Sequence, residues 1–275
     1  MTIIEPKNIQ RIGFILVPNF ALMSYASAAE PLRAANLIAG TDLYDAVPLS
    51  FDGEAVRSSS GIIVSCEALA AAGEKCHTIF VCAGGGPQDW TAAENSYGTL
   101  RRLARQGVRI GSISSGAYVL AAAGLLENRD FTIHWEHAPV LKEAFGHLTP
   151  RQARFVFDGD RITCAGGVAP LDMMHAMISQ RMGAHFARRV SDWYLHTAVA
   201  EPGAPQRGSS AERYGTNHPA LLTVLEKMET TIESPLSIAE VAFATGFSSA
   251  GHFSGSFKTR FGQTPNAMRQ RFPLN

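Results

Sequence analysis

The chain alternates short continuous runs of apolar residues with longer segments whose apolar residues recur at helical spacing. A short apolar run bounded by turn residues is typical of a buried strand, and an apolar stripe at helical period is typical of a helix packed on a sheet. We predict strands at 11–17, 44–50, 62–65, 78–82 and 108–113, and helices at 22–37, 93–106 and from 115 to near Gly124. This alternation predicts a doubly wound, flavodoxin-like α/β domain with a parallel sheet.

Two of the predicted strands end in residues suited to a ligand crevice. The run Thr78–Cys82 (TIFVC) continues into Ala83-Gly84-Gly85-Gly86, and the strand at 108–113 turns abruptly at Ser114-Ser115-Gly116 into an alanine-rich helix. Ligands of open α/β sheets bind beyond the carboxyl ends of the strands. We therefore expect the glycine loop and Ser114 to border the crevice.

The rest of this domain and its boundary follow from turn residues and a change in composition. A hairpin is predicted around Asp158-Gly159, followed by closing helices at 170–182 and 184–196. The stretch 201–214, EPGAPQRGSSAERY, has two prolines, two glycines and almost no apolar residue, which is typical of a linker. We predict an α/β domain at 1–200, a linker at 201–214 and a small all-α domain at 215–275.

The all-α domain carries a helix-turn-helix pattern at 236–261 after a first predicted helix at 219–232. Ser237 is suited to cap one helix, Gly246 to end it at positive φ, and Ser248 or Ser249 to cap the next. Phenylalanines recur every four residues in that second helix, at 253, 257 and 261, and form a stripe that faces the first helix. The opposite face is left free for a DNA groove.

Composition and charge narrow the function classes. The 275 residues are 46% hydrophobic and 17% charged with zero net charge, which is ordinary for a globular chain. A basic surface exists only locally: from Gly251 onward there are four cations, Lys258, Arg260, Arg269 and Arg271, and no carboxylate. The four cysteines lack CxxC spacing and we see no secretory leader, so we predict a cytoplasmic protein with no metal site and no cofactor. No apolar run is long enough to span a bilayer.

The segment 238–269, IAEVAFATGFSSAGHFSGSFKTRFGQTPNAMR, resembles the second helix-turn-helix of AraC/XylS-type transcription regulators. The resemblance rests on the GFSS corner, the HFS-x-x-F helix and the FG-x-x-P-x-x-x-R tail. It implies sequence-specific DNA binding. Such regulators carry two helix-turn-helix units joined by a long helix, whereas here the entry to a first unit at 232–237 runs directly into the second, so we predict that one unit is missing.

The resemblance and the helical wheel together predict which residues face DNA. We expect base contacts from Ser248, Ser249 and His252, and phosphate contacts from Lys258, Arg260 and Arg269. Gly251, Gly255 and Thr259 share the groove face. The two glycines offer no side chain to base edges and weaken the helix by about 1 kcal/mol each relative to alanine. A single recognition helix covers one major-groove turn, so we predict a homodimer that presents two.

The first two hundred residues are similar to the PfpI-type, class I glutamine amidotransferase-like domain that one subgroup of these regulators carries. The similarity rests on four segments, namely 29–32 (AEPL), 83–86 (AGGG), 111–117 (GSISSGA) and 134–135 (HW). Within the subgroup, the run ASAAEPLRAAN at 26–36 is most similar to regulators of arginine, carnitine and glycine-betaine catabolism. The resemblance implies a small effector of that class.

In PfpI-like enzymes a cysteine occupies the turn between strand and helix, and Ser114 stands there in this chain. A serine hydroxyl needs a base such as His134 to become a nucleophile. We therefore predict that the chain is not an enzyme and that the elbow of Ser114 and His134 is vestigial, with a PfpI-type hydrolase using these two residues as the alternative. A shortened regulator that acts only as a heterodimer is a further alternative.

If the crevice carries out no catalysis, it is still suited to bind a small zwitterion. We expect its carboxylate to lie near the amides of Ser115 and Gly116, its cation near Glu30, and Trp135 beside it. The predicted ligand-binding residues are Glu30, Gly84, Gly85, Ser114, Ser115, Gly116, His134 and Trp135. Two plainer interpretations remain open, namely that Glu30 is an ordinary solvated carboxylate and that His134 is a structural histidine.

Overall fold

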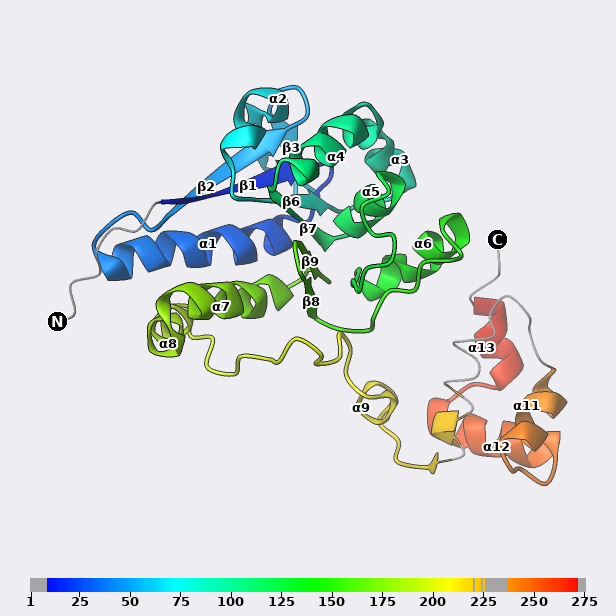
Figure 1. Cartoon of the computed structure of the whole chain (residues 1–275). Coiled ribbons are helices and arrows are strands. Elements are labelled where there is room, and N and C mark those ends of the chain that lie inside the picture. Colours follow the sequence, from blue (N-terminus) through cyan, green and yellow to red (C-terminus); the bar gives the residue numbers. More distant parts are fainter. Residues whose placement is uncertain (1–8, 220, 224, 226–236, 272–275) are drawn as a thin grey trace. The chain divides into compact units, whose positions relative to one another are not determined.

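The computed structural model describes residues 9–219, 221–223, 225 and 237–271. The chain forms two compact units that divide between Gln206 and Arg207, and each is described by itself. Figure 1 shows the α/β unit in blue to yellow-green and the helical unit in yellow to red.

The α/β unit is built on one mostly parallel sheet (Figure 1). Within the described residues the sheet has seven strands in the order β5-β2-β1-β6-β7-β9-β8. Neighbouring strands are parallel except β8 and β9, which form the antiparallel hairpin predicted around Asp158-Gly159. The strands are β1 (Gln10–Leu16), β2 (Tyr44–Ser50), β5 (Glu67–Ala68), β6 (Thr78–Ala83), β7 (Arg109–Ser114), β8 (Phe155–Asp158) and β9 (Arg161–Cys164). The predicted α/β class is confirmed.

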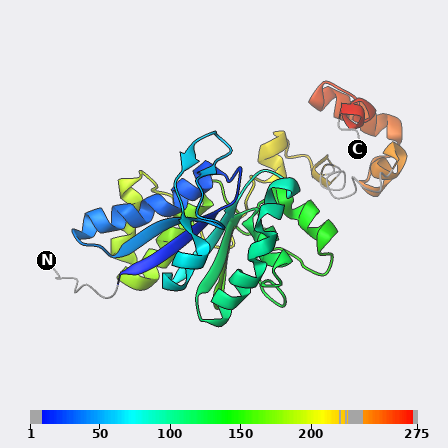
Figure 2. The ribbon, with the colours of Figure 1, turned by 90° about the horizontal axis from the view of Figure 1, so that it is seen from above.

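Helices cover both faces of the sheet, as the view in Figure 2 shows. One face carries α1 (Leu22–Ala39), α7 (Ala169–Met182) and α8 (Ala184–Trp193). The other carries α2 (Leu69–Ala72), α3 (Pro87–Trp90), α4 (Tyr97–Arg105), α5 (Gly116–Ala122) and α6 (Ala138–Ala144). A separate cluster of buried apolar side chains fills each interface, because strands covered on both faces bury successive side chains in opposite directions.

The strand predicted at 62–65 lies outside the main sheet. In the structure β4 (Ile63–Val64) pairs only with β3 (Val56–Arg57), in a small antiparallel ribbon. Ile62 and Ile63 are 54% and 58% exposed, and of this apolar run Val64 packs against the core, half-buried. Likewise, the helix predicted at 93–106 begins as a 3₁₀ segment, η2 (Thr91–Ser96), and becomes α-helical only in α4.

The segment predicted as a linker, 201–214, contains ordered structure of two kinds. Residues 201–206 run beside β8, where the backbone amide of Arg154 donates to the carbonyls of Pro202 and Ala204 at 3.1 Å. Further on, Ser209 and Glu212 form a reciprocal capping box at the start of α9 (Ser210–Tyr214). The composition of this stretch predicted a polar linker without regular structure. It did not predict the order of residues 201–206, because their hydrogen-bond partners lie far away in the sequence.

The helical unit contains α9, α11 (Ile238–Ala244), α12 (Ala250–Phe261) and α13 (Pro265–Arg271). Ser237 caps α11, Gly246 has φ of 81°, and the Ser249 hydroxyl accepts from the His252 amide to cap α12. Phe253 and Phe257 are fully buried, in a cluster with Leu221, Leu225, Val241, Ala242 and Phe247. The predicted helix-turn-helix is confirmed.

Two sequence predictions extend beyond the described residues. Of the helix predicted at 219–232, residues 219, 221–223 and 225 are helical, and the rest lies outside the described residues. The proposed junction at 232–236, where a first unit would enter, also lies outside them.

Among the described residues, we find no helix both long and apolar enough to cross a membrane. All four cysteines are free thiols, and Cys76, Cys82 and Cys164 are buried. Burial raises the pKa of Cys164 to about 12, so this thiol stays protonated at neutral pH.

Candidate effector site and DNA-binding unit

The turn after β7 is held in a strained backbone conformation. Ser114 ends β7 with φ of 60° and is 5% exposed. A non-glycine residue in this left-handed region costs on the order of 1–3 kcal/mol, which surrounding contacts must offset. Gly116 begins α5 so close to β6 that an added Cβ would lie 2.0 Å from the Val81 carbonyl oxygen. The elbow therefore requires glycine at 116 and tight packing around 114.

The elbow meets the glycine loop after β6, as the sequence predicts. The Ser115 hydroxyl donates to the Gly84 carbonyl at 3.3 Å, and the Trp90 indole N–H donates to the same oxygen at 2.7 Å. An added Cβ at Gly84 would lie 2.5 Å from the Asn19 carbonyl oxygen, so this loop also packs on the turn before α1. Gly84 and Ser114–Gly116 thus lie together at the carboxyl edge of the sheet.

A third strand end completes this edge and was missed by sequence reasoning. After β9, an added Cβ at Gly166 would lie 2.7 Å from the Ser114 Cβ. The next amide, of Gly167, donates to the hydroxyl of Ser24 at 2.8 Å, and Ser24 is 2% exposed. The glycine pair one residue after β9 is the signal that could have identified this segment, since glycines also follow β6.

His134 belongs to a turn that contacts the elbow region through Trp90. The Trp90 ring packs edge-on against His137 at 5.3 Å between centroids, and the His137 and His134 rings are 5.7 Å apart. Burial lowers the pKa of His134 below its ordinary value, partly offset by the Glu136 carboxylate. His134 Nδ1 accepts from the Glu136 amide at 3.4 Å. The histidine is therefore a neutral acceptor oriented by its own turn.

The structure does not pair the predicted nucleophile with the predicted base. Among the described residues, we find no hydrogen bond between the Ser114 hydroxyl and His134. Activation of a serine requires such a bond, and an orienting group for the base. Within the described residues, the predicted pair of Ser114 and His134 is therefore not assembled.

His134, Glu136 and His137 also place three potential metal-binding atoms within 4.8 Å of one another. The Glu136 side chain is 65% exposed, and one nitrogen of His134 is already a hydrogen-bond acceptor. Structural zinc sites enclose the ion with four ligands. We assign no metal to this turn, because the carboxylate is solvated and the trio is open.

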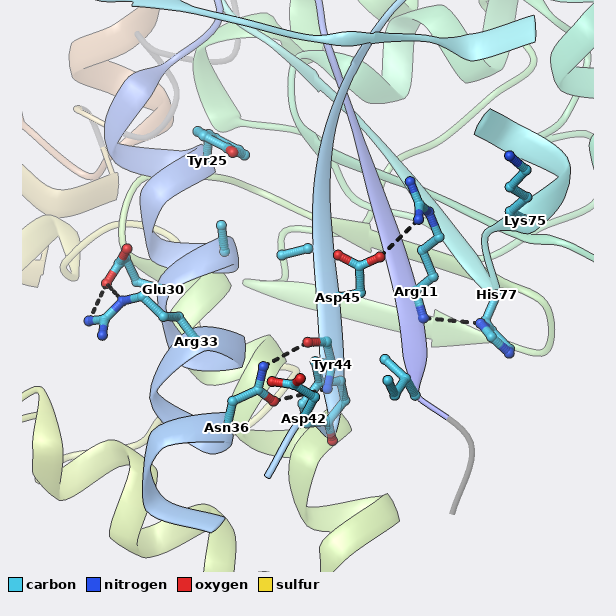
Figure 3. Close-up of a pocket in the computed structure, with 13 residues that line it drawn as sticks. Arg11, Tyr25, Glu30, Arg33, Asn36, Asp42, Tyr44, Asp45, Lys75 and His77 are labelled. Carbon is cyan, nitrogen blue, oxygen red and sulfur yellow. Dashed lines mark hydrogen bonds and ion pairs between the residues drawn. The ribbon is translucent and has the colours of Figure 1, made fainter. Parts of the chain in front are cut away.

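Glu30 lies in a different surface hollow from the elbow. Its carboxylate accepts from Arg33 Nε at 2.8 Å and from the Tyr194 hydroxyl at 3.2 Å. Hydrogen bonding to Arg33 lowers the pKa of Glu30. Figure 3 shows this pair on α1, in a hollow of about 780 Å³ that Arg11 and Asp45 also line and to which no elbow residue contributes. The structure therefore does not bring Glu30 together with the other predicted ligand-binding residues.

The exposed face of α12 carries most of the predicted DNA-binding residues. Ser248, Ser249, Gly251, His252, Gly255, Lys258, Thr259 and Arg260 are all exposed, whereas Phe253 and Phe257 are buried. Several polar atoms on this face already have local partners. The Ser248 hydroxyl lies 3.4 Å from His252 Nδ1, and the Thr259 hydroxyl donates to the Gly255 carbonyl at 3.0 Å. Lys258, which takes part in neither of these bonds, is thus better placed to reach outward than His252, whose ring contacts Ser248 and Phe247.

Arg260 and Arg269 are the other two residues predicted to contact phosphate. Arg260 Nη2 donates to the Tyr214 carbonyl at 3.4 Å, so this guanidinium is turned toward α9 within the helical unit. The side chain of Arg269 lies outside the part of the chain whose side chains are described. For Arg260 to contact a phosphate, its hydrogen bond to the Tyr214 carbonyl would have to break.

These features define a PfpI-type α/β domain joined to a helix-turn-helix, and comparisons with known proteins agree. Residues 10–180 match the model of the DJ-1/PfpI family, and residues 220–271 match the model of a helix-turn-helix domain. The chain belongs to the DJ-1/PfpI family and is a DNA-binding transcription regulator with an AraC-type helix-turn-helix.

Particular relatives make the assignment more specific. The chain is 60% identical to the HTH-type transcriptional regulator GlxA of Rhizobium meliloti, over 97% of this chain and 98% of the relative. It is 32% identical to the HTH-type transcriptional regulator GbdR of Pseudomonas aeruginosa, over 98% and 87%. An AraC family transcriptional regulator from Pseudomonas putida superposes with a TM-score of 0.61 at 28% identity, covering 67% of this chain and 99% of that structure.

The alignments with these two relatives are longer than this chain. The alignment with GlxA runs over 316 positions but contains 97% of this 275-residue chain, or about 267 residues, so about 49 positions of the relative face a gap. The alignment with GbdR, over 319 positions and 98% of the chain, leaves a gap of the same size.

Proposed function

We propose that this regulator senses a small zwitterion, an amino acid or a quaternary-ammonium acid, in the crevice at Ser114, without catalysis. The observation that carries the proposal is the convergence of three strand ends on a strained, buried Ser114 whose predicted base faces its own turn. Backbone strain of this kind persists where packing over-determines it and is common at ligand sites. The effector class rests on the resemblance of 26–36 to regulators of arginine, carnitine and glycine-betaine catabolism.

In this proposal the ligand carboxylate binds near the backbone of Gly84, Gly85 and Ser114–Gly116. The cation lies against the face of Trp135, which is 38% exposed and whose ring is tilted by 35° against the His134 ring, 5.4 Å away between centroids. A neutral imidazole beside the ligand avoids like-charge repulsion with an ammonium group. Cation–π contact suits quaternary ammonium groups, which cannot donate hydrogen bonds.

Titration calorimetry with glycine betaine, carnitine and arginine tests the proposal. We expect at least one to bind, and we expect Trp135→Ala to weaken that binding on the order of tenfold, the effect of losing a partly desolvated cation–π contact. Glu30→Gln is the matched control, because Glu30 is engaged with Arg33 and lies in the other hollow. Absence of binding by all three compounds would overturn the effector class, and an equal loss in Glu30→Gln would restore the charge-pairing model for Glu30.

The strained elbow by itself favours hydrolysis as a second candidate function, since nucleophile elbows share this backbone conformation. A generic ester or amide would then be cleaved by the wild type and not by Ser114→Ala. We expect no turnover that depends on Ser114, because the serine–histidine bond is not formed.

DNA binding by a single recognition helix is proposed to require two chains. A homodimer would present two copies of α12, which one chain cannot do. Sedimentation of the purified protein, followed by mobility shifts at low and moderate salt, tests this. A monomer that fails to shift DNA at low salt would favour the heterodimer alternative, and binding that weakens steeply with salt would support phosphate contacts.

A further inference from the structure

The chain leaving the α/β unit is attached to the edge of the sheet by specific hydrogen bonds. The Ala200 amide donates to the buried Asp172 carboxylate at 2.9 Å, and Ala153 forms an antiparallel bridge with Pro205. These contacts, and those of the Arg154 amide to the carbonyls at 202 and 204, fix residues 200–205 against α7 and the chain that enters β8. The segment arrives in an ordered path at Gln206, the last residue of the compact unit.

The side chain of Gln206 joins this segment to the turn that carries His134 and Trp135. Its Nε2 lies 2.9 Å from the Thr132 hydroxyl, 3.0 Å from the Ile133 carbonyl and 2.9 Å from the Ala153 carbonyl. Its Oε1 accepts from the Trp135 amide at 2.8 Å. The carboxamide therefore uses both its donors and its acceptor on backbone and side-chain groups that lie 53 to 74 residues away in sequence.

These bonds flank His134 on both sides. Ile133 and Thr132 are buried, at 1% and 0% exposure, so the amino-terminal side of the turn is fixed in the core. On the carboxyl-terminal side, the Trp135 backbone amide donates to Gln206 Oε1, so the same side chain also holds this end of the turn. The orientation of His134 and Trp135 thus depends on where the side chain at 206 sits.

The next residue in the chain, Arg207, begins the helical unit. We propose that Gln206 is a positioning residue that couples the effector turn at 133–135 to the chain segment leading into the DNA-binding unit. This inference rests on the proposed effector site. A ligand that moves His134 or Trp135 changes the fit of Gln206, and by thermodynamic linkage the docking of 200–206 changes ligand affinity by the same factor.

Hydrogen exchange of the full-length protein, resolved at single amides, tests the positioning role without any ligand. In Gln206→Met, which keeps the length of the side chain and removes its hydrogen bonds, we expect the Trp135 amide to exchange on the order of tenfold faster. The Thr132 amide, which donates to Thr163 Oγ1 at 2.9 Å, should not change. Glu201→Ala, an exposed change in the same segment, is the matched control and should leave both amides as in wild type.

Gln206→Glu separates the two ends of the carboxamide. It keeps an acceptor for the Trp135 amide and loses both donors, so we expect Trp135 to remain protected while the Ala204 and Ala200 amides exchange faster. Unchanged exchange at Trp135 in folded Gln206→Met overturns the positioning role. If Gln206→Met does not fold, unchanged exchange at Ala200 and Ala204 in Gln206→Glu overturns it.

The coupling is tested by adding glycine betaine, carnitine or arginine. In the wild type, a compound that binds should alter exchange at Ala200 and Ala204, and in Gln206→Met the same compound should bind without altering them. If the bound compound changes exchange at Ala200 and Ala204 equally in the wild type and in Gln206→Met, the coupling is overturned, although the proposed effector site is not. If none of the three compounds binds the wild type, the proposed effector class fails, and faster exchange at Trp135 in Gln206→Met still supports the positioning role.

Discussion

Arg154 donates to the fully buried carboxylate of Asp172, with Nε–Oδ2 at 2.8 Å and Nη2–Oδ2 at 2.6 Å. The other carboxylate oxygen accepts from His196 at 2.7 Å and from the Ala200 amide at 2.9 Å. One side chain of α7 thereby holds β8, the end of α8 and the start of the segment that reaches Gln206. This network links the sheet edge to the exit of the chain from the α/β unit.

Removal of this carboxylate should strongly destabilise the α/β unit. Breaking a buried ion pair by deleting one partner typically costs about 3–5 kcal/mol, because the other charge is left uncompensated. We expect Asp172→Ala to lower the free energy of unfolding by an amount in that range, measured by urea denaturation. Asp130→Ala is the matched control: Asp130 pairs with Arg151 at the surface, and exposed pairs contribute roughly 0–1 kcal/mol. Equal effects of the two changes would contradict this reading.

The strain at Ser114 predicts an order of stability among small substitutions. Glycine adopts φ of 60° without a Cβ penalty, whereas alanine retains the penalty and loses only the hydroxyl. We expect Ser114→Gly to be more stable than Ser114→Ala by about 1 kcal/mol in thermal or urea unfolding. If Ser114→Ala were instead the more stable of the two variants, residue 114 would not hold a strained backbone conformation in solution.

Alanine substitution at the two glycines of α12, Gly251 and Gly255, should have the opposite effect on stability to alanine substitution at Gly246, between α11 and α12. An added Cβ at Gly255 would meet nothing within 4 Å, and at Gly251 only Ser249 Oγ at 3.8 Å. Alanine at either position should therefore stabilise the helical unit by up to about 1 kcal/mol. Gly246→Ala, at φ of 81°, should destabilise it.

The same alanine variants report on DNA contact. If α12 approaches the groove closely at Gly251 and Gly255, the stabilised proteins should bind DNA more weakly in a mobility-shift assay. Stabilisation with unchanged binding would show that these glycines do not face DNA.

Stability should fall in mild acid because of the turn at 134–137. Burial lowers the pKa of both His134 and His137 from the ordinary value of 6.5. The unfolded chain then binds more protons than the folded chain below that pH, so stability is complete above about pH 6.5 and is lost as the pH falls through the lowered pKa values of the folded state. In His134→Gln/His137→Gln the decline between these values should be shallower. Parallel pH profiles of the wild type and the double variant would exclude this turn as the cause.

Local signals allowed the sequence to predict the elements and much of the DNA-binding part. The caps at Ser237 and Ser249 and the turn at Gly246 depend on hydrogen bonds and dihedral angles within a few residues, so their residue types suffice. The apolar runs of β1, β6 and β7 likewise predicted a parallel sheet. The meeting of Gly84 with Ser114 followed from a general rule about strand ends.

The tertiary structure alone decided which side chains share a site. Glu30 is paired with Arg33 in another hollow, Gly166 joins the elbow, and the polar stretch at 201–206 is attached to β8. Gln206 and Trp135 are 71 residues apart in sequence, and no local pattern encodes their contact. Sequence determines the periodicity, caps and turns of this regulator because these are short-range properties. The composition of its site depends on packing across the sheet, which only the folded chain fixes.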